Sequence, residues 1–294
     1  MDRQQTGFES AGKRCSAELY LPDAENPPVV VMAHGFGAER SFRLPAFAER
    51  FAEDGLATFL FDYRGFGDSE GTKQLVDPFR HRADWLAAVD HVRDLESVDG
   101  DRVALWGSSF SGGHVIETAA RREVDAVAAQ VPFVDGLATL LHLARNSGIG
   151  YPLEATKHGL KDAVRGLFRR SPHTVSIVGD TDEFAMLNTP GAKSGYLDIV
   201  PEDTDWENAC PARIALQVPM YRPISRASEV DCPVLLTIAR EDNIVPPAAA
   251  ERLADRLDHV EVLRLDCGHF GPYDGRPFER AVETQGGFLD RHLS

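Results

Sequence analysis

Short, continuously apolar segments recur along this chain of 294 residues, and segments with helical spacing separate them. Apolar runs of this length are typical of strands that are buried on both faces of a sheet. Alternation of such strands with helices predicts an α/β fold, in which helices cover both faces of a mostly parallel sheet. The strand-like segments are residues 28–34, 56–62, 102–107, 124–131, 233–239 and 260–265.

Apolar residues at helical spacing occupy the intervals between the first strands, over residues 42–54 and 77–95. Residues 246–257 begin with two prolines, which suit the first turn of a helix. The N-terminal part differs, because residues 17–21 alternate and precede a Pro-Asp turn. This pattern predicts an antiparallel hairpin at the edge of the sheet.

The strand–helix rhythm stops between about residues 133 and 228. This stretch holds helical patterns at residues 136–145 and 154–169, proline-containing loops and no clear strand sequence. A stretch of this length is too long for a simple connection within a compact domain. We therefore interpret residues 133–228 as an insertion into one core, which is built from residues 1–132 and 229–294.

The chain is acidic, with 31 lysines and arginines against 46 aspartates and glutamates and a formal net charge of −15. Binding to nucleic acid or to an anionic membrane requires a basic face, so we expect neither partner. Only five of the basic residues are lysines. A Lys-poor acidic surface fits adaptation to high salt, and it also fits the composition of a GC-rich genome.

The four cysteines, at positions 15, 210, 232 and 267, are scattered and form no CxxC pair. This spacing suggests neither a disulfide framework nor a zinc site. The first ten residues lack the apolar core of a signal peptide, and no apolar stretch approaches the roughly 20 residues that span a bilayer. We expect a cytoplasmic protein, either a monomer or a homodimer.

A buried strand runs directly into a glycine-rich turn at residues 105–113, which read LWGSSFSGG. A serine at the tip of such a strand-to-helix turn is strained, and the residues two before and two after it must be small. With Ser109 at the tip these are Gly107 and Ser111, so the pattern departs from G-x-S-x-G at one position. The alternative register puts Ser111 at the tip. We favour Ser109, because the strand then ends where the turn must begin.

Glycines also follow the first buried strand, in the segment His34-Gly35-Phe36-Gly37. They allow a backbone N–H group to approach a ligand oxygen closely. An oxyanion hole needs two such donors, one from this loop and one from the residue after the nucleophile. The candidates are the N–H groups of Phe36 and Phe110, whereas His34 is interpreted as a structural hydrogen-bonding residue.

Two further candidates follow later strands. Asp242 comes after the strand at residues 233–239, where an acid can reach a site above the sheet. We prefer it to Glu241, whose longer side chain is expected to point elsewhere. His269 follows the last strand, and the flanking glycines Gly268 and Gly271 allow it to bend back towards the sheet.

The order of these signals resembles the α/β-hydrolase superfamily, in which nucleophile, acid and histidine follow one another along the chain. The likeness covers about residues 10–135 and 230–292. Residues 61–71 (FDYRGFGDSEG) are similar to the superfamily's D-x-R-G-x-G-x-S segment, which shapes the loop beneath the site and is not catalytic. The resemblance implies an eight-stranded, mostly parallel sheet with a mainly helical cap inserted after strand six, here residues 133–228.

The resemblance to serine-esterase-like members implies acyl transfer by Ser109, with His269 as the base and Asp242 orienting the imidazole. It implies no metal and no organic cofactor. The expected substrate is a small-molecule carboxylic ester. Thioester hydrolysis and acyl transfer to another acceptor use the same triad and stay open. A peptidase and a non-catalytic binding protein are less favoured alternatives.

The insertion is expected to determine which substrates bind. Its candidate pocket-lining residues are Phe184, Met186, Leu187, Met220 and Tyr221. A predicted helix at residues 154–170 carries a set of apolar residues that would either line an acyl pocket or, as we favour, pack against the core. These are Leu160, Val164, Leu167 and Phe168. The helix also carries a basic cluster, for which a solvated helix end is favoured over a site for an anionic substrate. The cluster comprises Arg165, Arg169 and Arg170.

Overall fold

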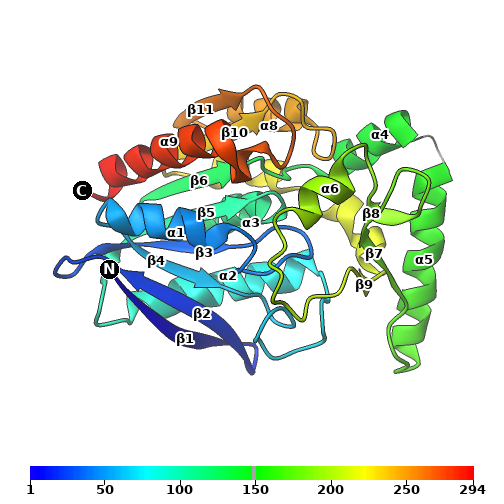
Figure 1. Cartoon of the computed structure of the whole chain (residues 1–294), viewed down its shortest axis with the longest axis horizontal. Coiled ribbons are helices and arrows are strands. Elements are labelled where there is room, and N and C mark those ends of the chain that lie inside the picture. Colours follow the sequence, from blue (N-terminus) through cyan, green and yellow to red (C-terminus); the bar gives the residue numbers. More distant parts are fainter. Residues whose placement is uncertain (148–149) are drawn as a thin grey trace.

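An eight-stranded sheet forms the centre of the molecule in the computed structural model, which describes residues 1–147 and 150–294 (Figure 1). The strand order is β1-β2-β4-β3-β5-β6-β10-β11. Neighbours from β4 to β11 are parallel, whereas β2 pairs antiparallel with both β1 and β4. The strands are β1 (Asp2–Ser10), β2 (Lys13–Leu21), β3 (Pro28–Ala33), β4 (Ala57–Phe61), β5 (Asp99–Ser108), β6 (Ala126–Gln130), β10 (Val234–Ala239) and β11 (Val260–Leu265).

Each face of the sheet supports its own apolar cluster. Alternate residues of one strand enter different clusters, so that Val29 and Val31 face one side while Val30 and Met32 face the other. Helices α1 (Leu44–Glu53) and α9 (Gly275–Leu293) pack on the second side. The first side is covered by α2 (Pro78–Arg93), α3 (Phe110–Ala119) and α8 (Pro247–Ala254).

The predicted α/β fold and the N-terminal hairpin are confirmed. All six predicted strands are present with ends shifted by at most a few residues, and β11 has the predicted bounds. In the hairpin, Asp2 pairs with Leu21 and Ser10 with Lys13. In the part of the chain that is described, the cysteines at positions 15, 210, 232 and 267 are unpaired. No described helix is both long and apolar enough to cross a bilayer.

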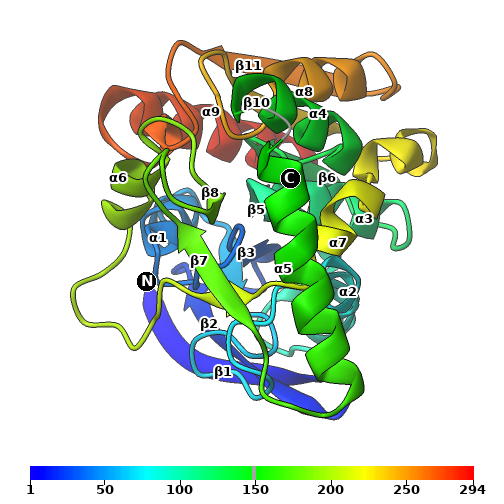
Figure 2. The ribbon, with the colours of Figure 1, turned by 90° about the vertical axis from the view of Figure 1, so that its right-hand side faces the viewer.

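The inserted segment (residues 133–228) lies beyond the carboxyl ends of β5 and β6 (Figures 1 and 2). The sequence shows no clear strand pattern here, but the segment contains β7, β8 and β9, which form a small separate sheet. These strands contain only two to five residues, so they leave no long apolar run in the sequence. The elements are α4 (Gly136–Ser147), α5 (Gly150–Leu167), β7 (Thr174–Val178), β8 (Ala185–Leu187), α6 (Ala192–Leu197), β9 (Cys210–Pro211), α7 (Ile214–Gln217), and the 3₁₀ helices η1 (Val218–Met220) and η2 (Pro223–Glu229).

The expectation for the apolar residues of the helix at 154–170 is wrong. Leu160, Val164, Leu167 and Phe168 neither line a pocket nor pack on the core, because all four are exposed to solvent. The buried positions of α5 are instead Tyr151, Ala155, Gly159 and Asp162. The inner face of this helix therefore holds small or polar residues after its first turn, where Tyr151 lies.

Three histidines are buried close to Tyr63, between the sheet and helices α2 and α3. The His81 ring stacks on Tyr63 with ring centroids 4.0 Å apart, and His114 Nδ1 lies 2.6 Å from the Tyr221 hydroxyl. Burial lowers the pKa of His34 and of His114 to about 3, and it lowers the pKa of His81 well below its ordinary value. The three rings are therefore neutral at pH 7.

We expect the free energy of unfolding to fall as the pH is lowered below about 6.5. The unfolded chain then binds protons on these histidines, whereas the folded protein leaves His34 and His114 neutral down to about pH 3. Each such histidine removes roughly 1.4 kcal/mol of stability per pH unit in this interval. Urea unfolding at a series of pH values measures the slope.

A matched pair of variants isolates this contribution from other titrating groups. His114→Gln removes one buried histidine, and His259→Gln changes an exposed one. We expect the pH dependence of stability to become shallower in His114→Gln and to stay unchanged in His259→Gln. Equal slopes in the wild type and His114→Gln would contradict the assignment.

Candidate active site

Ser109 occupies the sharp turn between β5 and α3. Its backbone has φ 56° and ψ −117°, a conformation that side chains other than glycine rarely adopt. Two backbone hydrogen bonds hold the turn, from Ser109 N–H to the Gln130 carbonyl and from Phe133 N–H to the Ser109 carbonyl, each 2.8 Å. A Cβ atom on Gly107 would lie 2.5 Å from the Ser111 carbonyl oxygen, so glycine is required there.

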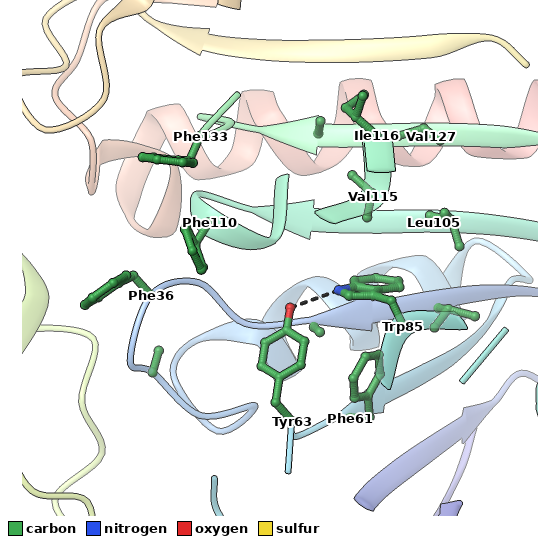
Figure 3. Close-up of a cluster of buried hydrophobic side chains, with 14 of the residues drawn as sticks. Phe36, Phe61, Tyr63, Trp85, Leu105, Phe110, Val115, Ile116, Val127 and Phe133 are labelled. Atoms are coloured by element: carbon green, nitrogen blue, oxygen red, sulfur yellow. Dashed lines mark hydrogen bonds between the residues drawn. The ribbon is translucent and has the colours of Figure 1, made fainter. Parts of the chain in front are cut away.

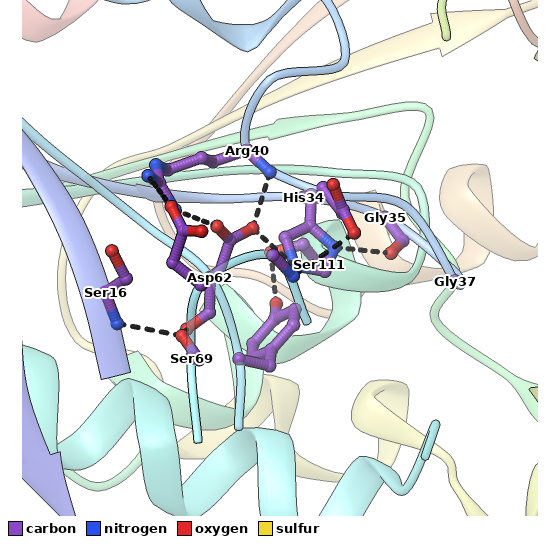
Figure 4. Close-up of polar contacts among 12 residues, drawn as sticks. Ser16, His34, Gly35, Gly37, Arg40, Asp62, Ser69 and Ser111 are labelled. Atoms are coloured by element: carbon purple, nitrogen blue, oxygen red, sulfur yellow. Dashed lines mark hydrogen bonds and ion pairs between the residues drawn. The ribbon is translucent and has the colours of Figure 1, made fainter. Parts of the chain in front are cut away.

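Ser111 lies inside the first turn of α3 and is fully buried. Its hydroxyl accepts a hydrogen bond of 2.9 Å from the Tyr63 hydroxyl, which in turn accepts one of 2.9 Å from Trp85 Nε1 (Figures 3 and 4). The structure thus gives Ser111 a partner beneath the turn and leaves Ser109 at its tip. The extra hydroxyl of the G-x-S-x-S pattern is satisfied by this buried chain of hydrogen bonds.

The structure brings Ser109, His269 and Asp242 together from three separate loops. His269 Nε2 lies 3.0 Å from Ser109 Oγ, and His269 Nδ1 lies 2.6 Å from Asp242 Oδ2. The other oxygen of Asp242 accepts 2.8 Å hydrogen bonds from the N–H groups of Ile244 and Val245. This arrangement can take a proton from the serine hydroxyl and stabilise the resulting imidazolium. The neighbouring Glu241 is exposed, as expected.

The two candidate oxyanion donors flank the serine. Phe110 is the first residue of α3, where a backbone N–H has no acceptor within the helix. Over residues 1–147 and 150–294, no hydrogen bond is donated by the Phe36 N–H either. A Cβ atom on Gly35 would lie 3.1 Å from the Ser109 Cβ, which is closer than ordinary van der Waals contact, so glycine favours the close approach of this loop to the serine.

Asp62 anchors the loop that carries Phe36. Its carboxylate accepts a 2.7 Å hydrogen bond from the Arg40 backbone N–H and pairs with the Arg40 guanidinium (Figure 4). On the same loop, His34 Nδ1 lies 3.1 Å from the Gly35 carbonyl oxygen. These contacts agree with the structural roles that the sequence suggests for His34 and for residues 61–71.

Two residues of the inserted segment hold the same loop from its other side, and the sequence gives no signal for either. The Tyr196 hydroxyl donates to the Phe36 carbonyl at 3.0 Å, and Trp206 Nε1 donates to the Gly37 carbonyl at 2.7 Å. More than 150 positions separate the partners along the chain. The inserted segment is therefore part of the support of the candidate oxyanion hole.

An apolar pocket extends from Ser109 into the inserted segment. It encloses about 740 Å³ of empty space, part of which opens to solvent. Helix α4 contributes Leu140 and Leu143, and helix α5 contributes Tyr151 and Ala155. Ser109 borders the pocket, and the other lining residues are apolar except for Thr139, Thr189 and Tyr151. The space therefore suits an apolar chain attached to a group that reacts at this serine.

Two of the five predicted lining residues, Met186 and Leu187, border this pocket. The other three do not border it. Phe184 stacks on His158, Met220 is exposed on η1, and the Tyr221 hydroxyl is engaged by His114.

A second, smaller space of about 350 Å³ lies on the His269 side of the serine. Its walls are almost entirely apolar and include Phe42, Tyr196 and Phe270. Within residues 1–147 and 150–294, no group of three or more His, Cys, Asp or Glu side chains is arranged to hold a metal ion.

Comparison with known proteins identifies the family. A model described as "Alpha/beta hydrolase family" matches residues 30–284. The quorum-quenching protein AidA of Acinetobacter baumannii (strain MDR-ZJ06) is 39% identical over 97% of this chain and 93% of its own length. The thiohydrolase aneE of Aspergillus aculeatus (strain ATCC 16872 / CBS 172.66 / WB 5094) is 40% identical over 37% of this chain and 34% of its own length.

The fold is shared with solved structures of much lower sequence identity. The alpha/beta hydrolase GrgF from Penicillium sp. sh18 aligns with a TM-score of 0.82 at 19% identity, covering 100% of this chain and 99% of its own. The family model and the relatedness to AidA carry the assignment beyond the fold. This chain belongs to the alpha/beta hydrolase family.

Proposed function

We propose that this protein is a serine hydrolase that cleaves carboxylic esters through an acyl-enzyme on Ser109. The observation that carries the proposal is the continuous hydrogen-bond chain from Ser109 Oγ through His269 to Asp242. A serine hydroxyl is a weak nucleophile on its own, and an adjacent base is what activates it.

In the first half of the reaction, His269 Nε2 takes the proton of Ser109 as Oγ bonds to the ester carbonyl carbon. The negative charge moves to the carbonyl oxygen, which the Phe36 and Phe110 N–H groups would stabilise. Loss of one such donor typically costs about 2.7–4 kcal/mol of transition-state stabilisation. The protonated His269 then donates its proton to the leaving alkoxide, and the acyl group stays on Ser109.

In the second half, water attacks the acyl-enzyme with His269 again accepting a proton. The resulting intermediate collapses as its bond to Ser109 Oγ breaks, His269 returns its proton to Oγ, and the carboxylic acid is released. Asp242 holds the imidazole in the tautomer that presents Nε2 to the serine, and its fixed position follows from the N–H groups of Ile244 and Val245.

The two spaces beside Ser109 support an assignment of the two halves of the substrate. The larger apolar pocket would receive the acyl chain. The leaving alcohol must lie near His269 to be protonated, so the smaller space would receive a compact alcohol group. We propose that residues 133–228 act as the cap that sets these dimensions. The name of AidA, a quorum-quenching protein, adds bacterial signalling molecules to the substrates to be tested.

Thioester hydrolysis is a second candidate, since the similarity to a thiohydrolase favours it. The same triad can serve both reactions, because in each the serine attacks an acyl carbonyl carbon. A thiolate also leaves more readily than an alkoxide, so thioester cleavage makes no further demand on the triad. A comparison of matched oxygen esters and thioesters of one acyl chain separates the two by their kcat/KM values.

We expect Ser109→Ala to lose both ester hydrolysis and labelling by a fluorophosphonate probe, with a fall in kcat on the order of 10⁶. Ser111→Ala is the matched control, because it removes a hydroxyl two residues away without touching the triad. Both variants are to be checked for unchanged circular dichroism. Labelling that persists in Ser109→Ala and disappears in Ser111→Ala would contradict the proposed nucleophile.

We expect nitrophenyl esters with medium-length acyl chains to be better substrates than the acetyl ester, because the longer chain fills the apolar pocket. Ala215→Phe narrows this pocket. It is expected to reduce kcat/KM for the longer esters about tenfold or more while leaving acetyl ester hydrolysis within about twofold. A uniform loss on all chain lengths would count against the pocket assignment.

A further inference from the structure

The outer face of α5 presents apolar side chains that the candidate site does not use. Leu153, Leu160 and Val164 recur along one side of the helix, and Leu167 and Phe168 follow at its end. Leu167 is 79% exposed and Phe168 is 67% exposed. Figures 1 and 2 show α5 as a long, straight helix along the outer surface of the inserted segment.

Basic residues accompany this apolar stripe. Two of the five lysines of the chain, Lys157 and Lys161, lie on α5, and Arg169 and Arg170 follow directly after it. Among the residues that the structure describes, Lys161, Arg169 and Arg170 have no carboxylate partner. The local charge is therefore positive, although the chain as a whole is acidic.

The carboxylates of the helix do not cancel this charge. Asp162 is fully buried and is bonded to the Arg213 guanidinium at 2.6 Å, and Glu154 pairs with Lys157. An exposed apolar stripe with unpaired basic side chains is typical of a helix that lies in the interface of a lipid layer.

We propose that α5 docks this protein on the surface of an anionic lipid bilayer. Leu160, Val164, Leu167 and Phe168 would enter the boundary between headgroups and acyl chains. Lys161, Arg169 and Arg170 would contact anionic headgroups, whose attraction for such residues acts at short range. The net negative charge of the whole chain, taken alone, argues against a membrane partner. The local charge at α5 has the opposite sign. Screening limits that repulsion to about 8 Å at physiological salt.

A lipid surface fits this face better than a second copy of the chain does. Two copies joined through the C-terminal end of α5, where Leu167 and Phe168 lie, would bring Arg169 and Arg170 of one copy close to those of the other, and this contact is repulsive. The exposed apolar residues also belong to a single helix and the residue directly after it. This helix runs along the outer surface of the inserted segment, where a flat lipid layer can reach it (Figure 2).

The position of α5 links the proposed surface to the acyl pocket. Tyr151 and Ala155, on the inner face of the same helix, border the pocket that reaches Ser109. A bilayer bound to the outer face would therefore lie one helix away from the space proposed for an apolar chain. Binding itself does not depend on the proposed reaction.

Vesicle co-sedimentation tests the proposal with the full chain carrying Ser109→Ala, so that no hydrolysis of lipid interferes. The probes are vesicles of phosphatidylglycerol and phosphatidylcholine in equal parts, and vesicles of phosphatidylcholine alone. We expect binding to the first and at least about tenfold weaker binding to the second. Molar salt is expected to reduce the difference.

Two double variants separate the contributions of the basic and the apolar residues to vesicle binding. Arg169→Gln with Arg170→Gln is expected to weaken binding to the anionic vesicles by about 25-fold, at roughly fivefold for each charge. Leu167→Ser with Phe168→Ser is expected to weaken it about tenfold or more. The matched controls are Arg276→Gln with Arg280→Gln on α9 and Leu197→Ser on α6, which change exposed residues elsewhere and are expected to bind like the parent.

The proposal is overturned if the parent protein does not sediment with anionic vesicles. It is equally overturned if the α9 charge variant loses as much binding as the α5 charge variant, because binding then follows total charge. A dimer in solution that Leu167→Ser with Phe168→Ser dissociates, together with absent vesicle binding, would assign the face to a second copy instead.

Discussion

The backbone of Ser109 is the constraint on which the candidate site depends. The positive φ angle of this non-glycine residue destabilises the fold by about 1–3 kcal/mol, so contacts with the surrounding structure must hold the backbone in place. Here β6 accepts the serine N–H, the Phe133 N–H binds the serine carbonyl, and the required small neighbour Gly107 leaves room for the turn. The sharp turn places the Ser109 hydroxyl beyond the carboxyl end of β5, within hydrogen-bond distance of His269. Helix α3 begins directly after the turn, at Phe110, so the N–H group of Phe110 has no acceptor within the helix.

The loop that carries Phe36, the other candidate oxyanion donor, is held both by the core and by the inserted segment. Asp62 and Arg40 fix it from the core, and Tyr196 and Trp206 fix it from the inserted segment. The inserted segment therefore does more than border a pocket, because its folding positions the loop next to Ser109. A change in the inserted segment is therefore expected to alter both the shape of the pocket and the geometry of the site. Precise placement of donors is what gives an oxyanion hole its effect.

Much of the core and its site could be predicted from the sequence, because the signals are local. Apolar runs locate the buried strands, and glycine spacing locates the turns that bring Ser109, Asp242 and His269 to one edge of the sheet. The inserted segment was harder to predict. Its strands are too short to leave a pattern, and α5 buries Gly159 and Asp162 while exposing Leu167 and Phe168, which reverses the usual relation between polarity and burial. Tyr196 and Trp206 act across long sequence separations, which no local pattern records.

The proposed mechanism requires that Ser109 becomes covalently acylated. Rapid mixing of the protein with a nitrophenyl ester, followed by acid quench and peptide mass spectrometry, tests it directly. When deacylation limits turnover, we expect a burst of nitrophenol close to one equivalent per active site and an added acyl mass on the peptide that contains Ser109. Acylation of the same peptide at Ser111, or of any residue outside it, would contradict the role of Ser109 as nucleophile. So would steady turnover by a protein that never carries the acyl group.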